Sequence, residues 1–191
     1  MSTQRNAIAG LMTSITCILG PISIAVPFSP VPISLGLFGI LLTTSLLGAK
    51  LGILSCTLYL LLGLVGLPVF SGFTSGIGVL LGPTGGYLLG YLLVAACSSI
   101  FIREKSLHSH SEASLTHKKS AYLLQGAGMA CGLFLCYFLG SLWLAKFLSI
   151  TFGNALLIGV LPYIPADLAK LVLALWLGRL LRKRLTKANL V

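Results

Sequence analysis

Asp167 and Lys170 are the residues whose types and spacing best suit specific chemistry in this sequence. Both lie inside the last apolar segment, and Asp167 is the only acidic residue outside positions 103–120. Three residues apart on a helix, the two side chains share a face. A charged group at the centre of a membrane helix costs about 2.5–3.5 kcal/mol on insertion scales, so such residues usually mark a ligand site or a transport pathway. The alternative is an internal ion pair that only holds helices together.

A glycine-rich connection between positions 66 and 90 is the second candidate site. It is too rich in glycine for a stable helix and too apolar for an ordinary exposed loop. Irregular backbone at membrane depth is tolerated where it lines a cavity, and its free N–H and C=O groups can then bind a ligand. We predict a partly re-entrant loop that lines or covers a site, the alternative being a flexible connection. Nearby side chains that could supply polar contacts or apolar walls are Thr74, Ser75, Thr84, Tyr87, Phe70, Phe73 and Tyr163.

The first apolar segment carries small residues at Gly10 and Ser14. This small-xxx-small spacing lets the backbone of another helix approach closely. We expect a helix–helix contact there.

The elements that must position these residues are apolar helices. Hydrophobic residues make up 57% of the 191 residues and charged residues only 8%, whereas soluble domains carry about 25% charged residues. The sequence therefore predicts an all-α integral membrane protein, a single domain over 1–191 with a bundle of six transmembrane helices. The expected helices are 7–26, 33–47, 51–65, 87–102, 121–147 and 156–181.

Basic residues alternate with neutral connections along the chain. Connections 27–32, 67–86 and 151–154 carry no charge, while every other connection and both ends are basic. Because cytoplasmic loops collect Lys and Arg, this alternation predicts an even number of spans with both termini in the cytoplasm. Lys146 is the exception, and we expect it to snorkel to the membrane interface. The basic residues at these connections and at the two ends are Arg5, Lys50, Arg103, Lys105, Lys118, Lys119, Arg179, Arg182, Lys183, Arg184 and Lys187.

The net charge of +10 does not indicate nucleic-acid binding, because the charges lie at segment ends and not on one face. The cytoplasmic loop 103–120 carries His108, His110 and His117. We interpret it as a solvated loop and predict no metal site. A membrane enzyme that uses Asp167 and Lys170 stays open, although no histidine, cysteine or second carboxylate accompanies them. An ion channel or proton carrier is a further alternative.

Three motifs resemble those of the BioY family of biotin transporters. The first joins Gly66-Leu-Pro-Val-Phe70 to Gly82-Pro-Thr-Gly-Gly-Tyr-Leu-Leu-Gly90. The second is Pro27-Phe-Ser-Pro-Val-Pro-Ile-Ser34, and the third is Pro165-Ala-Asp-Leu-Ala-Lys170. The resemblance extends over nearly the whole chain and is weakest at 103–120.

The resemblance implies a non-enzymatic, substrate-binding S component of an energy-coupling factor (ECF) transporter in the bacterial inner membrane. Such a chain captures biotin from outside and works with a transmembrane coupling protein and two cytoplasmic ATPases, although some members are reported to work without them. No cofactor is expected in this chain, since ATP is used by the partners. An S component for riboflavin or thiamine is the nearest alternative.

The resemblance also assigns roles to residues. Gly10 and Ser14 are expected to contact the coupling protein, and Asp167 is expected to accept from the biotin ureido ring. Lys170 would donate to the ureido oxygen or to the ligand carboxylate. No Arg, Lys or Asn occurs between Lys50 and Arg103, which leaves Lys170 or Lys146 to neutralise that carboxylate.

Overall fold

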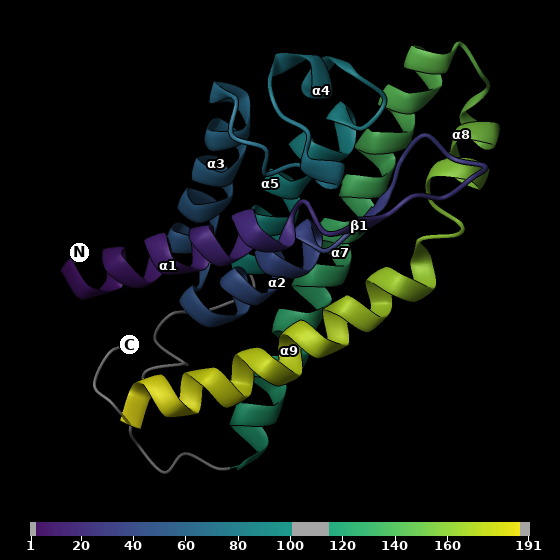
Figure 1. The fold of residues 1–191 in the computed structure, drawn as a ribbon. Helices are drawn as coiled ribbons and strands as arrows, with labels where there is room; N and C mark the ends of the chain where they lie inside the picture. Colours follow the sequence, from purple (N-terminus) through teal and green to yellow (C-terminus); the bar gives the residue numbers. More distant parts are fainter. Residues whose placement is uncertain (1–2, 101–114, 188–191) are drawn as a thin grey trace.

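The computed structural model describes residues 3–100 and 115–187, and the described chain is mostly helical (Figure 1). A two-stranded hairpin, β1 (Ser23–Ile24) with β2 (Ile33–Ser34), and a short 3-10 turn, η1 (Ser71–Phe73), interrupt the helices. The α-helices are α1 (Thr3–Leu19), α2 (Gly36–Leu47), α3 (Ala49–Val65), α4 (Ile77–Leu81), α5 (Gly85–Ile100), α7 (Leu115–Leu148), α8 (Phe152–Gly159) and α9 (Ile164–Lys187).

The bundle is built around the pairing of α5 with α7, and α3 packs on α5 while α2 packs on α9 and α1. Glycines allow the close approach of α5 and α7. A Cβ at Gly132 would lie 2.7 Å from the Cα of Val94, and one at Gly90 would lie 2.6 Å from the sulfur of Cys136. The start of α1 and the end of α9 lie on the same side of the molecule (Figure 1).

The helices differ in their ability to cross a bilayer by length alone. Residues Leu123–Leu148 of α7 form one apolar stretch of 26 residues, and the pair α8 with α9 passes the same test as one unit bent by 56°. Four other apolar helices have 10–17 residues, fewer than the roughly 20 that a full span needs. The described helices therefore contain one or two spans by this criterion, and the six-span bundle stays a prediction.

The first helix ends earlier than expected. Instead of continuing to Val26, α1 stops at Leu19, and the chain turns into β1. Pro21 supplies no backbone N–H and disfavours helix at the residue before it, which explains the stop. The β hairpin also takes Ile33 and Ser34 from the start of the second expected helix, since Ser23 pairs with Ser34.

The last apolar segment is also not one straight helix. It begins at Phe152, where the Thr151 hydroxyl accepts from the N–H of Asn154 at 3.4 Å, and breaks after Gly159. A second helix, α9, restarts at Ile164 with Pro165 in its first turn. Proline suits that position because its missing N–H has no partner in a first turn.

The glycine-rich connection has a defined shape. Gly66, Gly72 and Gly76 adopt positive φ angles of 113°, 69° and 87°, which L side chains rarely allow. The Gly76 N–H donates to the Gly63 carbonyl at 2.7 Å, and the Trp143 indole donates to the Gly82 carbonyl at 2.8 Å. The connection is therefore fastened to α3 and α7, while its depth in a membrane stays a prediction.

Candidate functional site

Asp167 and Lys170 form a buried ion pair at the start of α9. The Lys170 Nζ lies 2.8 Å from the Asp167 Oδ1. Asp167 is 6% exposed and Lys170 8% exposed. The backbone N–H of Asp167 donates to the Tyr163 carbonyl at 2.9 Å, so the carboxylate sits in the first turn of the helix. The helix dipole favours a negative charge there.

Two further groups complete the network around the pair. The Tyr137 hydroxyl of α7 donates to the Asp167 Oδ2 at 2.7 Å, and the Lys170 ammonium donates to the Ser34 carbonyl at 2.7 Å. A carboxylate offers about four acceptor sites and an ammonium three donors. Tyr137 and Lys170 occupy two of the acceptor sites, and Asp167 and Ser34 occupy two of the donors. Acceptor capacity on Asp167 and one Lys170 proton therefore remain for a ligand.

This network borders a small cavity of about 40 Å³. The polar residues that line it are Ser34, Tyr87, Tyr91, Tyr137, Tyr163, Asp167 and Lys170. Its apolar and backbone lining comes from Val31, Pro32, Ile33, Leu37, Leu133, Cys136 and Gly159.

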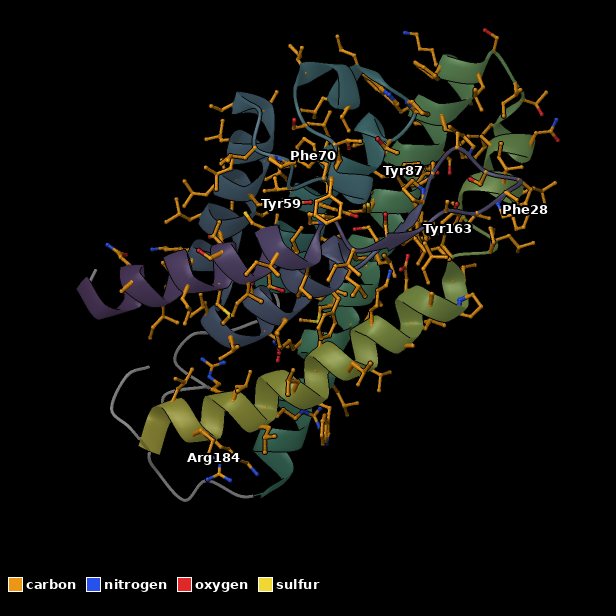
Figure 2. All side chains as sticks on the ribbon, in the orientation of Figure 1. Phe28, Tyr59, Phe70, Tyr87, Tyr163 and Arg184 are labelled. Atoms are coloured by element: carbon orange, nitrogen blue, oxygen red, sulfur yellow. The ribbon has the colours of Figure 1, made fainter. Side chains whose placement is uncertain are left out.

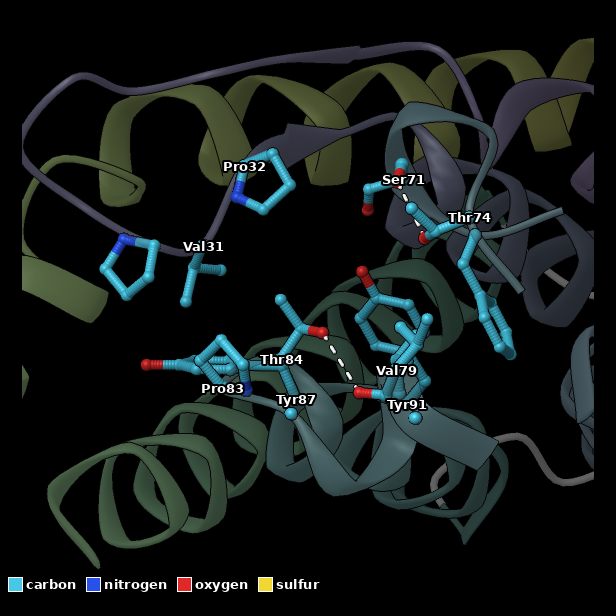
Figure 3. Close-up of a pocket in the computed structure, with 14 residues that line it drawn as sticks. Val31, Pro32, Ser71, Thr74, Val79, Pro83, Thr84, Tyr87 and Tyr91 are labelled. Carbon is cyan, nitrogen blue, oxygen red and sulfur yellow. Dashed lines mark hydrogen bonds between the residues drawn. The ribbon is translucent and has the colours of Figure 1, made fainter. Parts of the chain in front are cut away.

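A larger cavity, of about 360 Å³, is drawn in Figure 3. The two cavities share Val31, Pro32, Tyr87 and Tyr91 as lining residues. Val31 and Pro32 lie on one side in Figure 3, and Pro83, Thr84 and Tyr87 on the other. Phe70, Ser71, Thr74, Gly78, Val79 and Gly82 from the glycine-rich connection also line the large cavity, together with Pro30 and Leu88. Its volume lies in the range of ordinary small-molecule sites, roughly 300–1,000 Å³.

Tyr87 and Tyr163 fasten the walls of both cavities. The Tyr87 hydroxyl donates to the Gly159 carbonyl at 3.0 Å and ties α5 to the end of α8. The Tyr163 hydroxyl donates to the Val31 carbonyl and ties the start of α9 to the β hairpin loop. Figure 2 shows both tyrosines and Phe70 far from Arg184, which lies near the opposite end of α9.

The predicted site residues of the glycine-rich connection divide into those that line a cavity and those that do not. Thr74 and Thr84 line the large cavity, whereas Ser75 and Phe73 line neither cavity. Phe73 is 71% exposed with a positive φ of 59°, so its ring turns away from the site. It is Phe70, 1% exposed, that supplies the aromatic wall.

The remaining residues predicted to have a role do not line either cavity. Gly10 and Ser14 lie on the exposed face of α1, where a Cβ on Gly10 would meet no atom within 4 Å. Lys146 is exposed near the end of α7 and lines neither cavity. The side chains of His108, His110 and His117 lie outside the described part of the structure.

Several lining residues were not singled out individually from the sequence. The motif at 27–34 was noted only as a loop, yet it supplies Val31 and Pro32 to both cavities. Tyr91 follows Tyr87 by one helical turn, a spacing that could have indicated a shared face. Tyr137 is an amphipathic residue within an apolar helix, but only the fold brings it to Asp167. Ser71 was also missed.

Comparison with known sequences gives a consistent family match. The model of the family described as BioY matches residues 1–187. A probable biotin transporter BioY of Pyrococcus horikoshii is 35% identical over 170 residues, covering 89% of this chain and 91% of the relative. The biotin transporter BioY of Thermotoga maritima is 35% identical over 175 residues, covering 92% and 94%.

A solved structure also matches the fold. The S-component for biotin from an ECF-type ABC transporter superposes with a TM-score of 0.80 at 30% sequence identity. The match covers 96% of this chain and 95% of the other. The helical bundle and its connections are therefore those of a known transporter subunit architecture.

Proposed function

This chain belongs to the BioY family, and we propose that it captures biotin outside the cell and delivers it to the cytoplasm. The observation that carries the proposal is the buried Asp167–Lys170 pair, which keeps hydrogen-bonding capacity beside a cavity. The biotin names of the sequence relatives and of the structural relative support the ligand. These relatives are named as transporters, which favours transport over the alternative of a membrane enzyme.

The chemistry of the pair suits the ureido ring of biotin, which has two N–H donors and one C=O acceptor. The remaining acceptor sites of Asp167 take the N–H groups, and the remaining Lys170 proton is donated to the ureido oxygen. The Tyr137 hydroxyl holds the carboxylate in position through Oδ2. The apolar body of the ligand then lies against Tyr87 and Tyr91, and its tail extends into the large cavity.

The ligand must enter a membrane-embedded bundle. We propose six spans with both termini in the cytoplasm of a bacterium, formed by α1, α2, α3, α5, α7 and the bent pair α8 with α9. Support comes from the alternation of basic and neutral connections. The start of α1 and the end of α9 also lie on the same side of the molecule in Figure 1. In this arrangement the glycine-rich connection lies on the outer side, dips partly toward the site and admits the vitamin.

Energy for uptake comes from other chains in this proposal, namely a transmembrane coupling protein and two cytoplasmic ATPases. Gly10 and Ser14 are the contact to the coupling protein. Their support is the open space above Gly10 and the exposed position of both residues on α1. Small residues on such a face allow a partner helix to approach closely.

The test is equilibrium binding of radiolabelled biotin to the purified chain in detergent, with Asp167→Asn beside the parent. Hydrogen bonds to charged groups contribute about 1.5–3 kcal/mol, so the variant should bind roughly 10- to 150-fold more weakly. Ser75→Ala is the matched control, since Ser75 lines neither cavity, and it should bind like the parent.

Each alternative gives a different result. Equal binding by parent and Asp167→Asn would remove the pair from the site while leaving the ligand in place. Displacement of the label by riboflavin or thiamine at concentrations far below those needed with unlabelled biotin would reassign the vitamin. A folded parent that binds no biotin would refute the proposed function.

A further inference from the structure

The two cavities differ in charge. The small cavity holds both Asp167 and Lys170, whose charges cancel. The fourteen residues that line the large cavity include no Lys, Arg, His, Asp or Glu. Among the described residues, the site as a whole is therefore electrically neutral and its one cation is already paired.

Lys170 is poorly placed to serve a ligand carboxylate. Its ammonium already donates to the Asp167 carboxylate at 2.8 Å and to the Ser34 carbonyl at 2.7 Å. A second carboxylate brought to that ammonium would lie beside Asp167, and two like charges at one buried site disfavour each other. The acid end of biotin must then lie away from the pair, in the large cavity. Lys146 does not reach it either, since Lys146 lines neither cavity.

The large cavity offers hydroxyl groups in place of a cation. Ser71 and Thr74 lie together at one end of it, and Thr84 lies on the facing wall (Figure 3). Thr74 is exposed, so this end opens at the surface of the chain. The Thr74 hydroxyl already donates to the Ser71 carbonyl at 3.0 Å, and the Thr84 hydroxyl donates to the Val79 carbonyl at 3.4 Å. Of these three hydroxyls, it is therefore that of Ser71 that can donate to a ligand. A hydroxyl donates equally well to a carboxylate oxygen and to an amide or ester carbonyl, whereas a cation would favour the anion strongly.

We propose, on the basis of the proposed biotin site, that this chain binds the carboxyl end of its ligand without using a positively charged side chain. Neutral biotin derivatives modified at the carboxyl group, such as the amide and the methyl ester, are therefore ligands of the same site. The ureido ring carries the specificity, and the carboxyl end contributes only neutral hydrogen bonds and contacts with water.

Competition against radiolabelled biotin tests this inference with the purified chain in detergent. Unlabelled biotin, biotin amide and biotin methyl ester should compete within about fivefold of one another, because a neutral hydrogen bond contributes about 1 kcal/mol. Failure of biotin itself to bind would refute the proposed function. Tight binding of biotin with competition by the amide weakened 100-fold or more would refute only the present inference.

Installing a cation gives a second, independent readout. Ser71→Lys places an ammonium at the hydroxyl end of the large cavity. It should shift the affinity ratio of free biotin to its amide about fivefold toward free biotin relative to the parent, since a charge-assisted bond is about twice as strong as a neutral one of about 1 kcal/mol. Ser75→Lys adds the same charge to the same connection outside both cavities and should leave the ratio unchanged. If Ser71→Lys folds, binds biotin and shows the parental ratio, the carboxyl group does not lie at this end and the inference is wrong.

Discussion

The contact between Gly63 and Phe70 joins helix α3 closely to the cavity wall. A Cβ placed on Gly63 would lie 2.1 Å from the Cζ of Phe70 and 2.4 Å from its Cε1, far inside the carbon–carbon contact distance of about 3.5 Å. The ring cannot retreat easily, because it is 1% exposed and packs edge-on against Tyr59 at a centroid distance of 5.7 Å.

Gly63→Ala should therefore lower the free energy of unfolding by about 1–3 kcal/mol, the usual cost of overpacking. The replacement also gains about 1 kcal/mol of helix propensity, which must be removed from the comparison. Gly10→Ala is the matched control, since Gly10 is also inside a helix and its added Cβ would meet no atom within 4 Å. The difference between the two variants isolates the clash.

A double-mutant cycle makes the reasoning specific. Phe70→Ala alone leaves a void and should cost about 3–5 kcal/mol, while Gly63→Ala added to it should cost little more, because the obstructing ring is gone. Pulse proteolysis in detergent gives the free energies, and biotin binding should weaken in each Gly63 or Phe70 variant because Phe70 lines the large cavity. Additive costs in the cycle, or equal stability of Gly63→Ala and Gly10→Ala, would refute this account of the wall.

Three further predictions concern the pair, the connection and the α1 face. Lys170→Met should cost about 3–5 kcal/mol because it leaves Asp167 buried without its cation, and the double variant with Asp167→Asn should recover part of that cost in the same unfolding assay. Trp143→Phe removes the indole donor to the Gly82 carbonyl and should speed biotin dissociation, about fivefold for a loss of about 1 kcal/mol; an unchanged dissociation rate would show that this bond does not hold the connection over the ligand. Gly10→Leu should leave biotin binding by the isolated chain unchanged but strongly reduce uptake in cells that contain the ATPase module, and unchanged uptake would remove this face from the partner contact.

Composition and spacing were sufficient to predict helices and the shared helix face of Asp167 and Lys170. Apolar stretches separated by basic or glycine-rich connections predicted most of the helical segments, because burial in lipid selects apolar residues over whole helices. The Asp167–Lys170 spacing predicted a shared face, and the 2.8 Å ion pair confirms it. Both inferences rest on local information.

What the sequence could not provide depends on contacts between distant segments. Tyr137 reaches Asp167 because α7 and α9 converge. Val31 becomes a cavity wall through the folding of the β hairpin, and the Tyr163 hydroxyl binds its carbonyl. Phe70 and Phe73 look equivalent in sequence, yet the positive φ of Gly72 between them helps to send one ring inward and the other outward. Hydropathy alone also missed the early end of α1, where Pro21 disfavours further helix.

The C-terminal end of α1 has hydrogen bonds to both sides of the proposed ligand site. The Gly20 carbonyl accepts from the Ser34 hydroxyl at 2.8 Å, and the Ser34 carbonyl in turn accepts from the Lys170 ammonium. The Pro21 carbonyl accepts from the N–H of Gly72 in the glycine-rich connection at 3.0 Å. A shift of α1 would therefore disturb both the Ser34–Lys170 contact and the glycine-rich connection. A partner that docks on α1 could change the affinity of the chain for the vitamin. By thermodynamic reciprocity, the vitamin would then change the affinity for that partner by the same factor. The 17 residues of α1 span about 25 Å. Through this helix, a docked partner would bind an occupied chain with a different affinity from an empty one.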